Sequence, residues 1–388
     1  LEGQGGRVSE VIAAPELDAY LGLDIGAAVA DTVLDALIPG GGRGRIPVVA
    51  VSGTNGKTTV TRLLTHALSL TGLHVGMTCT DGIYLGARRI DTDDCSGPKS
   101  ARLVLLNPQV EAAVLETARG GILREGLAFD GCDLAVVTNI GEGDHLGLGG
   151  IDTVERLAEV KQTIVRGVAP WGTAVLNAAD PLVVPMAKVC RGSVLFFASD
   201  AAHPVLVRHR REGGRVAFVR GDAVVLAAGR DEVMSIGFDG IPLTHGGRVR
   251  FQVENALACI GGLWALGLPW DSIRAALATF GTDTDKSPGR FNVLSLNGTT
   301  AIFDYGHNPS SLLAMVEALG GFPHRRRIAV YSAAGDRRDE AMIRQGEILG
   351  AAFDQVILYE DHYVRGRLPG RSWPCSTRGS GPAVGWPR

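Results

Sequence analysis

The chain has 388 residues, 45% of them hydrophobic, which is enough for two or three domains with buried cores. Its formal net charge of −3 gives no electrostatic reason to expect nucleic acid or an anionic membrane as a partner. It contains no apolar run typical of a transmembrane helix, and we expect no signal peptide. The six cysteines form no CxxC pair, so we expect reduced thiols in a cytoplasmic protein.

Residues 1–44 precede the first strong structural signal. A short helical periodicity covers residues 27–37, and a Gly-rich run follows at residues 39–42. The first residue is Leu1 rather than Met, as in a fragment. We therefore expect residues 1–44 to be a linker or the remnant of a preceding module.

The strongest signal is a short Gly-rich stretch between an expected strand and an expected helix. Residues 45–50 are apolar and β-branched, and residues 60–70 have helical spacing that ends near Gly72. Between them, the order Gly-rich turn, Lys57, Thr58 is that of a phosphate-binding loop, in which backbone N–H groups and the lysine bind phosphates and the hydroxyl binds Mg²⁺. An ordinary strand-turn-helix connection is the alternative. The expected phosphate contacts are Gly53, Thr54, Asn55, Gly56, Lys57, Thr58 and Thr59.

Strands and helices alternate from residue 45 to about residue 280. This pattern predicts an α/β fold with a mostly parallel sheet covered by helices on both faces. Three further strands are predicted at residues 74–78, 111–116 and 133–139. The last two end in Glu116 and Asn139, at the strand ends where open α/β sheets bind ligands. Glu116 and the later His145 could hold a metal beside the phosphates, although a solvated Glu and a structural His are the plainer interpretations.

Residues 153–168 predict one amphipathic helix with a misplaced charge. At 100° per residue, Lys161 falls in the middle of the apolar face. An unpaired buried ammonium is costly, so Lys161 should reach the helix edge, pair with a partner or be modified.

Residues further along the chain complete the predicted elements. We expect short hairpins between residues 193 and 250, around glycine pairs 213–214 and 246–247, and a helix that begins at residues 251–258. Beyond them, a strand near residue 302 is followed by a helix that starts at Pro309. Strands at residues 327–332 and 355–359 follow.

Several motifs resemble those of a known family. Gly-Thr-Asn-Gly-Lys-Thr-Thr at residues 53–59 resembles the ATP loop of the Mur ligase superfamily, whose members join a carboxylate to an amine. Residues 80–84, 97–101, 115–124 and 144–149 resemble the C-terminal half of the cyanophycin synthetase family. The resemblance runs from about residue 45 to about residue 367, and Glu-Thr-Ala-Arg-Gly-Gly-Ile-Leu-Arg from Glu116 onward is its most specific part.

The resemblance implies an activity, cofactors and site residues. It implies an ATP-dependent ligase that uses Mg²⁺ and joins the α-amino group of arginine to the β-carboxylate of aspartate in a poly-aspartate (cyanophycin) primer. It also implies that Lys161 is carbamylated and binds metal with Thr58, Glu116 and His145, and that these groups, with Lys57, form the catalytic set. The further nucleotide contacts are Asn139, Asn255, Arg290 and Asp304, and the expected substrate contacts are Thr80, Asp81, Arg119, His307, Glu360 and Asp361.

The predicted domain layout has four parts. We expect the linker 1–44, a central ATP-binding domain 45–285, a smaller and incomplete α/β domain 286–370, and an aberrant tail 371–388. The tail has no helical period, and its possible codons, read one base out of phase, permit an apolar helical run. A shifted reading frame would explain it, and a divergent tail is the alternative.

Two other functions stay open from the sequence. The chain could be another Mur-type ligase that makes a peptidoglycan precursor or polyglutamate, although residues 1–44 are too few for the N-terminal module that such an enzyme needs. It could also be an inactive nucleotide-binding fragment. We expect a homo-oligomer for the full-length protein.

Overall fold

The computed structural model describes residues 44–141, 146–147, 149–281, 283–284, 286–360 and 368. The chain divides into two units, Leu1–Ile46 and Pro47–Arg388. The elements described below all belong to the second unit. The helix expected at residues 27–37 and the tail expected at residues 371–388 lie outside the described residues.

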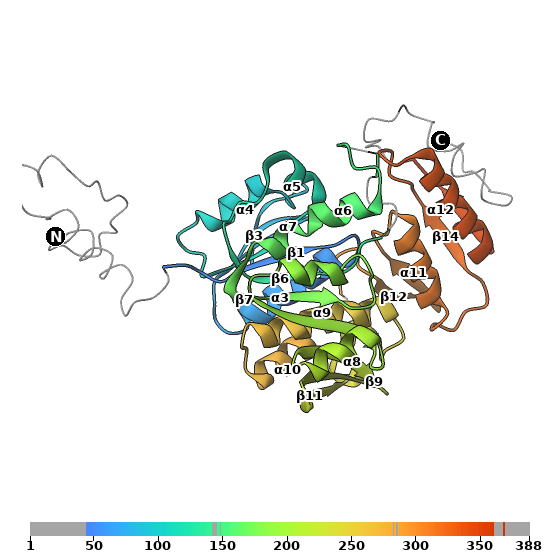
Figure 1. Ribbon diagram of the computed structural model, residues 1–388. Coiled ribbons are helices and arrows are strands. Elements are labelled where there is room, and N and C mark those ends of the chain that lie inside the picture. The colour runs from blue at the N-terminus through green and yellow to red at the C-terminus, as the bar shows by residue number, and fades with distance from the viewer. Residues whose placement is uncertain are drawn as a thin grey trace, which may run out of the picture. The chain divides into compact units, whose positions relative to one another are not determined.

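The described part of the second unit contains an 11-stranded sheet (Figure 1). Its strand order is β11-β10-β9-β8-β7-β6-β1-β5-β2-β3-β4. The central strands from β2 to β9 in this order are parallel, whereas β3, β4, β10 and β11 pair antiparallel at the two edges. The strands are β1 Val48–Ser52, β2 Val75–Cys79, β3 Gly82–Leu85, β4 Arg88–Asp91, β5 Ala112–Glu116, β6 Cys132–Val137, β7 Val168–Asn177, β8 Ser193–Asp200, β9 Arg215–Arg220, β10 Ala223–Ala228 and β11 Asp231–Gly237.

Helices cover both faces of the central strands, as the alternating pattern predicts (Figure 1). Helices α3 (Lys57–Ser69), α9 (Arg250–Ala265) and α10 (Trp270–Thr279) share one core with side chains of β1, β5 and β6. Helices α4 (Pro98–Leu105) and α7 (Thr163–Arg166) pack on the opposite face. All five residues of β1 are buried, so the strand before the Gly-rich loop lies in the deepest layer of the fold.

Three predictions from the sequence are wrong in detail. The single helix expected at residues 153–168 is divided into α6 (Val154–Lys161) and α7, and Val168 already begins β7 because Gly167 ends the helix. The hairpin expected around residues 246–247 is absent, since these glycines join the 3₁₀ helix Pro242–Thr244 to α9. Residues 213–214 do not turn a hairpin either. They join α8 (Pro204–Arg211) to β9, which runs parallel to β8, because Pro204 starts a helix that the local pattern did not reveal.

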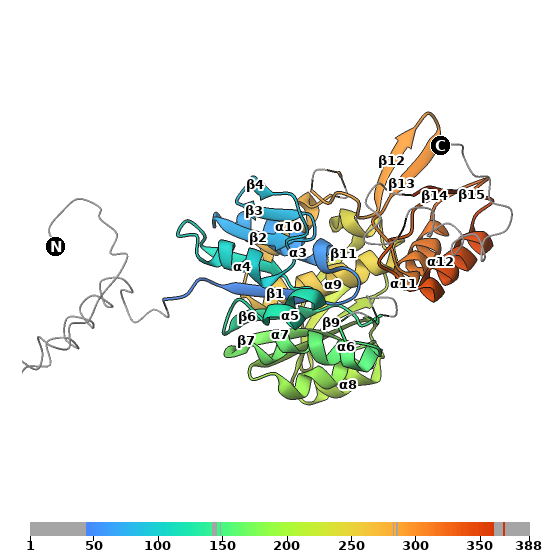
Figure 2. The same cartoon turned by 90° about the horizontal axis from the view of Figure 1, so that it is seen from above.

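Residues 292–358 form a smaller set of elements that Figure 2 shows from above. A two-stranded hairpin of β12 (Asn292–Leu296) and β13 (Thr299–Phe303) precedes α11 (Pro309–Leu319). Strands β14 (Ile328–Tyr331) and β15 (Gln355–Leu358) pair in parallel and are linked by α12 (Asp339–Ala352). The strand, polar turn and Pro-started helix expected after residue 302 are confirmed, and Asn308 caps α11 through a capping box. None of the described helices is both long and apolar enough to cross a membrane.

Candidate functional site

The loop between β1 and α3, residues 53–56, is held by the chain that follows β6. The Thr54 N–H donates to the Asn139 carbonyl (2.8 Å), and the Asn55 N–H donates to the Asn139 side-chain oxygen (2.9 Å). The Thr138 hydroxyl donates to the Asn55 carbonyl (2.6 Å). Gly53, with φ of +143°, lies so close to Thr138 that a Cβ would collide with its hydroxyl. The protein's own contacts therefore fix the loop conformation.

The other end of the loop packs against α9. Gly56 has φ of +85° and precedes the first turn of α3, and a Cβ there would collide with the Asn255 side-chain oxygen. Asn255 is buried, and its amide donates to the Gln252 side-chain oxygen (2.9 Å). Asn255 is therefore next to the loop and not on a solvent-facing side of α9.

An oxygen-rich cluster lies at the first turn of α3 and the end of β5. The Thr58 hydroxyl donates to Glu116 Oε2 (2.8 Å), and the Thr80 hydroxyl donates to Glu116 Oε1 (2.9 Å). The Thr80 N–H also donates to Glu116 Oε2 (3.2 Å). Glu116 is only 2% exposed, and these donors satisfy its buried carboxyl oxygens next to the loop between β1 and α3.

Two lysines contact the same loop from different elements. Lys57 Nζ donates to the Thr54 carbonyl (3.0 Å). Lys161, the last residue of α6, donates from Nζ to the Gly53 carbonyl (2.8 Å) and is 1% exposed. Of the three outcomes expected for Lys161, burial with a partner is the one observed, and the partner belongs to the loop. Carbamylation stays a prediction.

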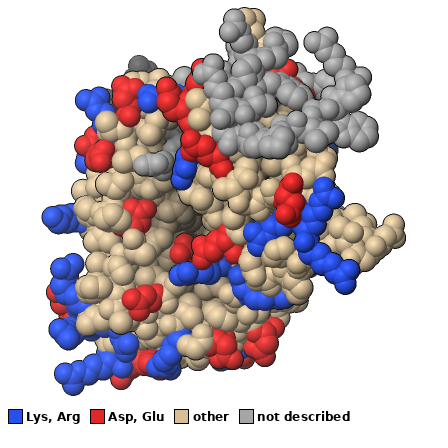
Figure 3. All heavy atoms as spheres, turned by 90° about the vertical axis from the view of Figure 1, so that its right-hand side faces the viewer, with Lys and Arg blue, Asp and Glu red and all other residues tan. Residues whose placement is uncertain are grey.

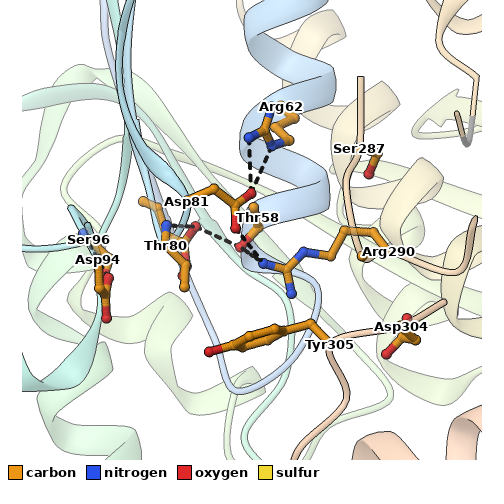
Figure 4. A network of polar contacts seen from close by, with 12 residues as sticks. Thr58, Arg62, Thr80, Asp81, Asp94, Ser96, Ser287, Arg290, Asp304 and Tyr305 are labelled. Carbon is orange, nitrogen blue, oxygen red and sulfur yellow. Dashed lines mark hydrogen bonds and ion pairs between the residues drawn. The ribbon is translucent and has the colours of Figure 1, made fainter. Parts of the chain in front are cut away.

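The side chains of Arg62 and Arg290 contact the Asp81 carboxylate from two sides (Figure 4). Arg290 Nη2 lies 3.3 Å from Thr58 Oγ1 and 3.3 Å from Asp81 Oδ1. The opposite oxygen, Asp81 Oδ2, accepts from Arg62 Nη2 (3.0 Å) and Nε (3.2 Å). The Arg290 guanidinium also lies over the Tyr305 ring, 4.9 Å from its centroid. Arg290 thus reaches the first turn of α3 from the segment before β12.

Further contacts join the loop to the residues that precede α11. Asn308 Nδ2 donates to Asn55 Oδ1 (2.9 Å), and Asn55 Nδ2 donates to the Ser310 hydroxyl (2.9 Å). Asp304 accepts the N–H of Phe291 on one oxygen (2.9 Å) and the N–H of Gly306 on the other (2.6 Å). Burial raises the pKa of the Asp304 carboxyl.

Most of these groups line one cleft of about 1220 Å³. It contains most of the residues that the sequence predicted for the site: Thr54, Asn55, Gly56, Lys57, Thr58, Thr59, Thr80, Glu116, Arg119, Asn139, Lys161, Asn255, Arg290, Asp304 and His307. Figure 3 shows acidic and basic side chains interspersed over one face of the molecule, as expected from the small net charge.

Five predicted residues are not among the described residues that line the cleft. Gly53 supplies the carbonyl that Lys161 contacts, and Asp81 lies behind Arg290 and Thr58. Glu360 follows β15 but does not line the cleft. His145 and Asp361 lie outside the described residues. Within the described ranges, no group of three His, Cys, Asp or Glu residues is arranged to hold a metal.

The thiol of Cys79 lies near the site but is not reactive. Cys79, at the end of β2, is buried, and burial followed by the nearby Glu116 charge raises the pKa of its thiol to about 12. The thiol is therefore protonated at neutral pH, which excludes it as a thiolate nucleophile.

Sequence reasoning missed Arg62, Thr138 and Asn308 as parts of the site. Arg62 lies one helical turn after Thr58 on α3, so the i, i+4 spacing was a signal that could have found it. Thr138 and Asn308 act by hydrogen bonds to Asn55 across long sequence distances, for which the sequence carries no local signal.

Comparison with known proteins identifies relatives of the chain. It is 42% identical over 381 residues to cyanophycin synthetase from Synechocystis sp., a match that covers 98% of this chain and 43% of that protein. The chain thus spans less than half the length of this relative. It is also 28% identical over 325 residues to UDP-N-acetylmuramoyl-L-alanyl-D-glutamate–2,6-diaminopimelate ligase from Caldanaerobacter subterraneus, covering 82% of this chain and 62% of that protein.

Comparison of structures finds the same fold. The structure of E. coli FolC in complex with DHPP and ADP matches with a TM-score of 0.62 and 18% identity, covering 91% of this chain and 82% of FolC. The family model for the Mur ligase middle domain matches residues 51–263, and the model for the Mur ligase, glutamate ligase domain matches residues 289–371. The chain therefore belongs to the Mur ligase family.

Proposed function

We propose that the chain is an ATP-dependent amide ligase that activates a carboxylate as an acyl phosphate and transfers it to an amine. The observation that carries the proposal is the cleft in which Lys57, Glu116 and Arg290 surround the loop between β1 and α3. The substrate carboxylate attacks the γ-phosphorus of ATP, and ADP is the leaving group. The amine nitrogen then attacks the acyl carbon, and phosphate leaves with loss of one proton from nitrogen. Positioning and charge neutralisation supply the catalysis.

The donor set of the site suits Mg²⁺. The Thr58 hydroxyl and the Glu116 carboxylate are hard oxygen ligands 2.8 Å apart, next to the phosphate-binding loop. We assign metal binding to these two residues, with His145 and a carbamate on Lys161 as further ligands implied by the family. The ion would neutralise charge on the transferring phosphoryl group. Lys57 would bind phosphate oxygens after releasing the Thr54 carbonyl.

For the substrates, we propose a poly-aspartate or cyanophycin primer as the carboxylate donor and arginine as the amine. The support is the 42% identity to a cyanophycin synthetase over nearly the whole chain, with the Arg-Gly-Gly motif intact from Arg119 onward. Thr80, Arg119 and His307 line the cleft and are the side chains that we assign to substrate contact. Glu360 and Asp361 remain candidates for binding the arginine side chain by charge.

The test is ADP release with Mg²⁺ and ATP, measured with and without arginine and with and without a poly-aspartate primer. We expect release only when both substrates are present, with arginine incorporated into the primer. Lys57→Ala should abolish it, whereas Lys188→Ala, a change at an exposed lysine of the 3₁₀ helix Val184–Val189, should not. Release that needs glutamate or diaminopimelate instead of arginine would replace the proposed substrates with those of another Mur-type ligase. Tight ATP binding without turnover would favour the inactive fragment.

A further inference from the structure

Asp81 is held between two guanidinium groups and does not line the cleft. It lies with Thr80 in the two-residue turn between β2 and β3, whose end residues Cys79 and Gly82 are paired. Because so short a turn between paired strands allows little movement, the sheet restrains the backbone of Asp81. The close-up in Figure 4 places this carboxylate between Arg62 and Arg290.

Arg62 fixes Asp81 from the side of α3. Two of its nitrogens contact Asp81 Oδ2, and its guanidinium also donates to the Tyr84 hydroxyl (2.9 Å) and lies over that ring. A third nitrogen, Nη1, donates to the Lys286 carbonyl (3.4 Å). The Arg62 side chain is 7% exposed, so it is restricted by contacts on several sides. It joins α3, the β2–β3 turn and the segment that carries Arg290.

Arg290 uses the remaining oxygen of Asp81. Its Nη2 lies between Asp81 Oδ1 and Thr58 Oγ1, while Tyr305 stacks on its plane. Its Nε is buried and has no hydrogen-bond partner among the described residues. One carboxylate faces two guanidinium groups, and the Arg290 guanidinium keeps an unused donor, Nε, while its Nη2 lies beside the first turn of α3.

We infer that Asp81 and Arg62 are positioning residues that hold the Arg290 guanidinium beside Thr58, ready for a phosphate oxyanion. Asp81 acts on the reaction through Arg290 and not as a substrate ligand. The inference rests on the proposed function only in naming nucleotide phosphate as the anion that Arg290 meets. The contacts that position Arg290 are made by protein groups and do not require a bound nucleotide.

The first test needs no nucleotide and follows backbone hydrogen exchange of residues 286–292. Asp81→Asn keeps the side-chain shape but removes its charge, and Arg62→Lys keeps the charge but removes the fork. Each should raise exchange in this segment about tenfold, a typical scale for coupling between contacting groups. Exchange in β1 should not change. Asp81→Glu should restore part of the protection, and Asp271→Asn, at a fully exposed carboxylate, should have no effect.

The second test is the dissociation constant for Mg²⁺-ATP by calorimetry. Asp81→Asn should weaken binding about tenfold in the native background and cause no further loss in an Arg290→Ala background. An equal loss in both backgrounds, or unchanged exchange of residues 286–292 in both Asp81→Asn and Arg62→Lys, would overturn the inference. Failure of the native protein to bind Mg²⁺-ATP would instead remove the proposed function, and the exchange test would still decide the positioning role.

Discussion

Strands β1 and β14 are both short apolar strands, but they are buried to different extents. All five residues of β1 are buried, because α3 and α9 cover one face of the sheet and α7 contacts the strand from the other. In β14, Ala329 and Tyr331 are buried against α11 and α12, whereas Ile328 is 51% and Val330 is 66% exposed. The loop after β1 therefore rests on a two-sided core, and β14 rests on a one-sided core.

This difference in burial corresponds to two different contributions to the site. A two-sided core fixes backbone geometry, and the central sheet uses it to hold the unusual backbone angles of Gly53 and Gly56. The residues after 286 instead contribute individual side chains, such as Arg290 and Asn308, through a few polar contacts with the loop. We conclude that the 11-stranded sheet and its helices supply the conformation of the site, and that the elements after residue 286 supply groups that complete it.

The largest expected effect comes from the charge at the end of β5. Glu116→Gln keeps the shape and an acceptor for Thr58 or Thr80 but removes the charge that we assign to Mg²⁺, so ligase turnover should fall on the order of 100-fold. Steady-state ADP release over a Mg²⁺ titration measures it. Glu111→Gln, the same change just before the start of β5, should leave turnover unchanged. Equal losses of turnover for the two variants would contradict a specific role for the Glu116 carboxylate.

A matched pair of valines tests the difference in burial directly. Val114 in β5 is fully buried, so Val114→Ala should lower the free energy of unfolding by about 2 kcal/mol through lost contacts and a cavity. Val330→Ala in β14 should change it by less than about 0.5 kcal/mol, because most of that side chain is already in water. Urea unfolding of both variants measures the two values. A large loss for Val330→Ala would mean that something covers this face of β14.

Asn308 separates capping of α11 from contact with the loop. Asn308→Ala removes the acceptor for the Ser311 N–H and the donor to Asn55, and should cost about 1 kcal/mol of stability. Asn308→Asp keeps the capping acceptor but loses the amide donor, so it should keep stability while weakening Mg²⁺-ATP binding. Thermal unfolding and calorimetry together distinguish the two outcomes. If both variants bind nucleotide normally, the contact between Asn308 and Asn55 does not support the site.

The smallest expected effect is a pH dependence that arises in the central domain. Burial lowers the pKa of His209, whose ring packs edge-on against Phe196. Below pH 6.5 the unfolded chain then binds more protons than the folded one, so stability present above pH 6.5 is lost as the pH falls through the lowered folded pKa. His209→Gln should reduce this slope, measured by urea unfolding between pH 7 and about pH 5. Burial also lowers the pKa of His66 and His245, so part of the slope should remain.

Much of the fold was predictable because its signals are local. The apolar runs predicted β1, β2, β5 and β6 to within a few residues, and the Lys-Thr pair marked the start of α3. Helical periodicity placed Lys161 on the apolar face of its helix and left three outcomes open, of which burial with a partner is the one observed. These predictions needed no knowledge of distant partners.

The remaining features depend on contacts that local patterns do not encode. The break between α6 and α7 depends on where the chain must leave the helix to enter β7. The parallel pairing of β8 with β9 depends on the helix that joins them. Likewise, the sequence alone does not show that Asp81 contacts Arg62 and Arg290 and does not line the cleft. Its expected role in substrate binding came from resemblance, and contact geometry favours a different one.

The place of β1 in the sheet also has a consequence for how the protein is made. Val48 pairs with Ala113 on one side, and Val49 pairs with Leu134 on the other. During synthesis, β1 leaves the ribosome long before either neighbour exists, so it cannot take its central position until residues near 137 have emerged. Such distant pairing slows folding, because loop closure comes before any contact is gained. We therefore expect the loop between β1 and α3 to reach its final conformation late in folding, although it comes early in the chain.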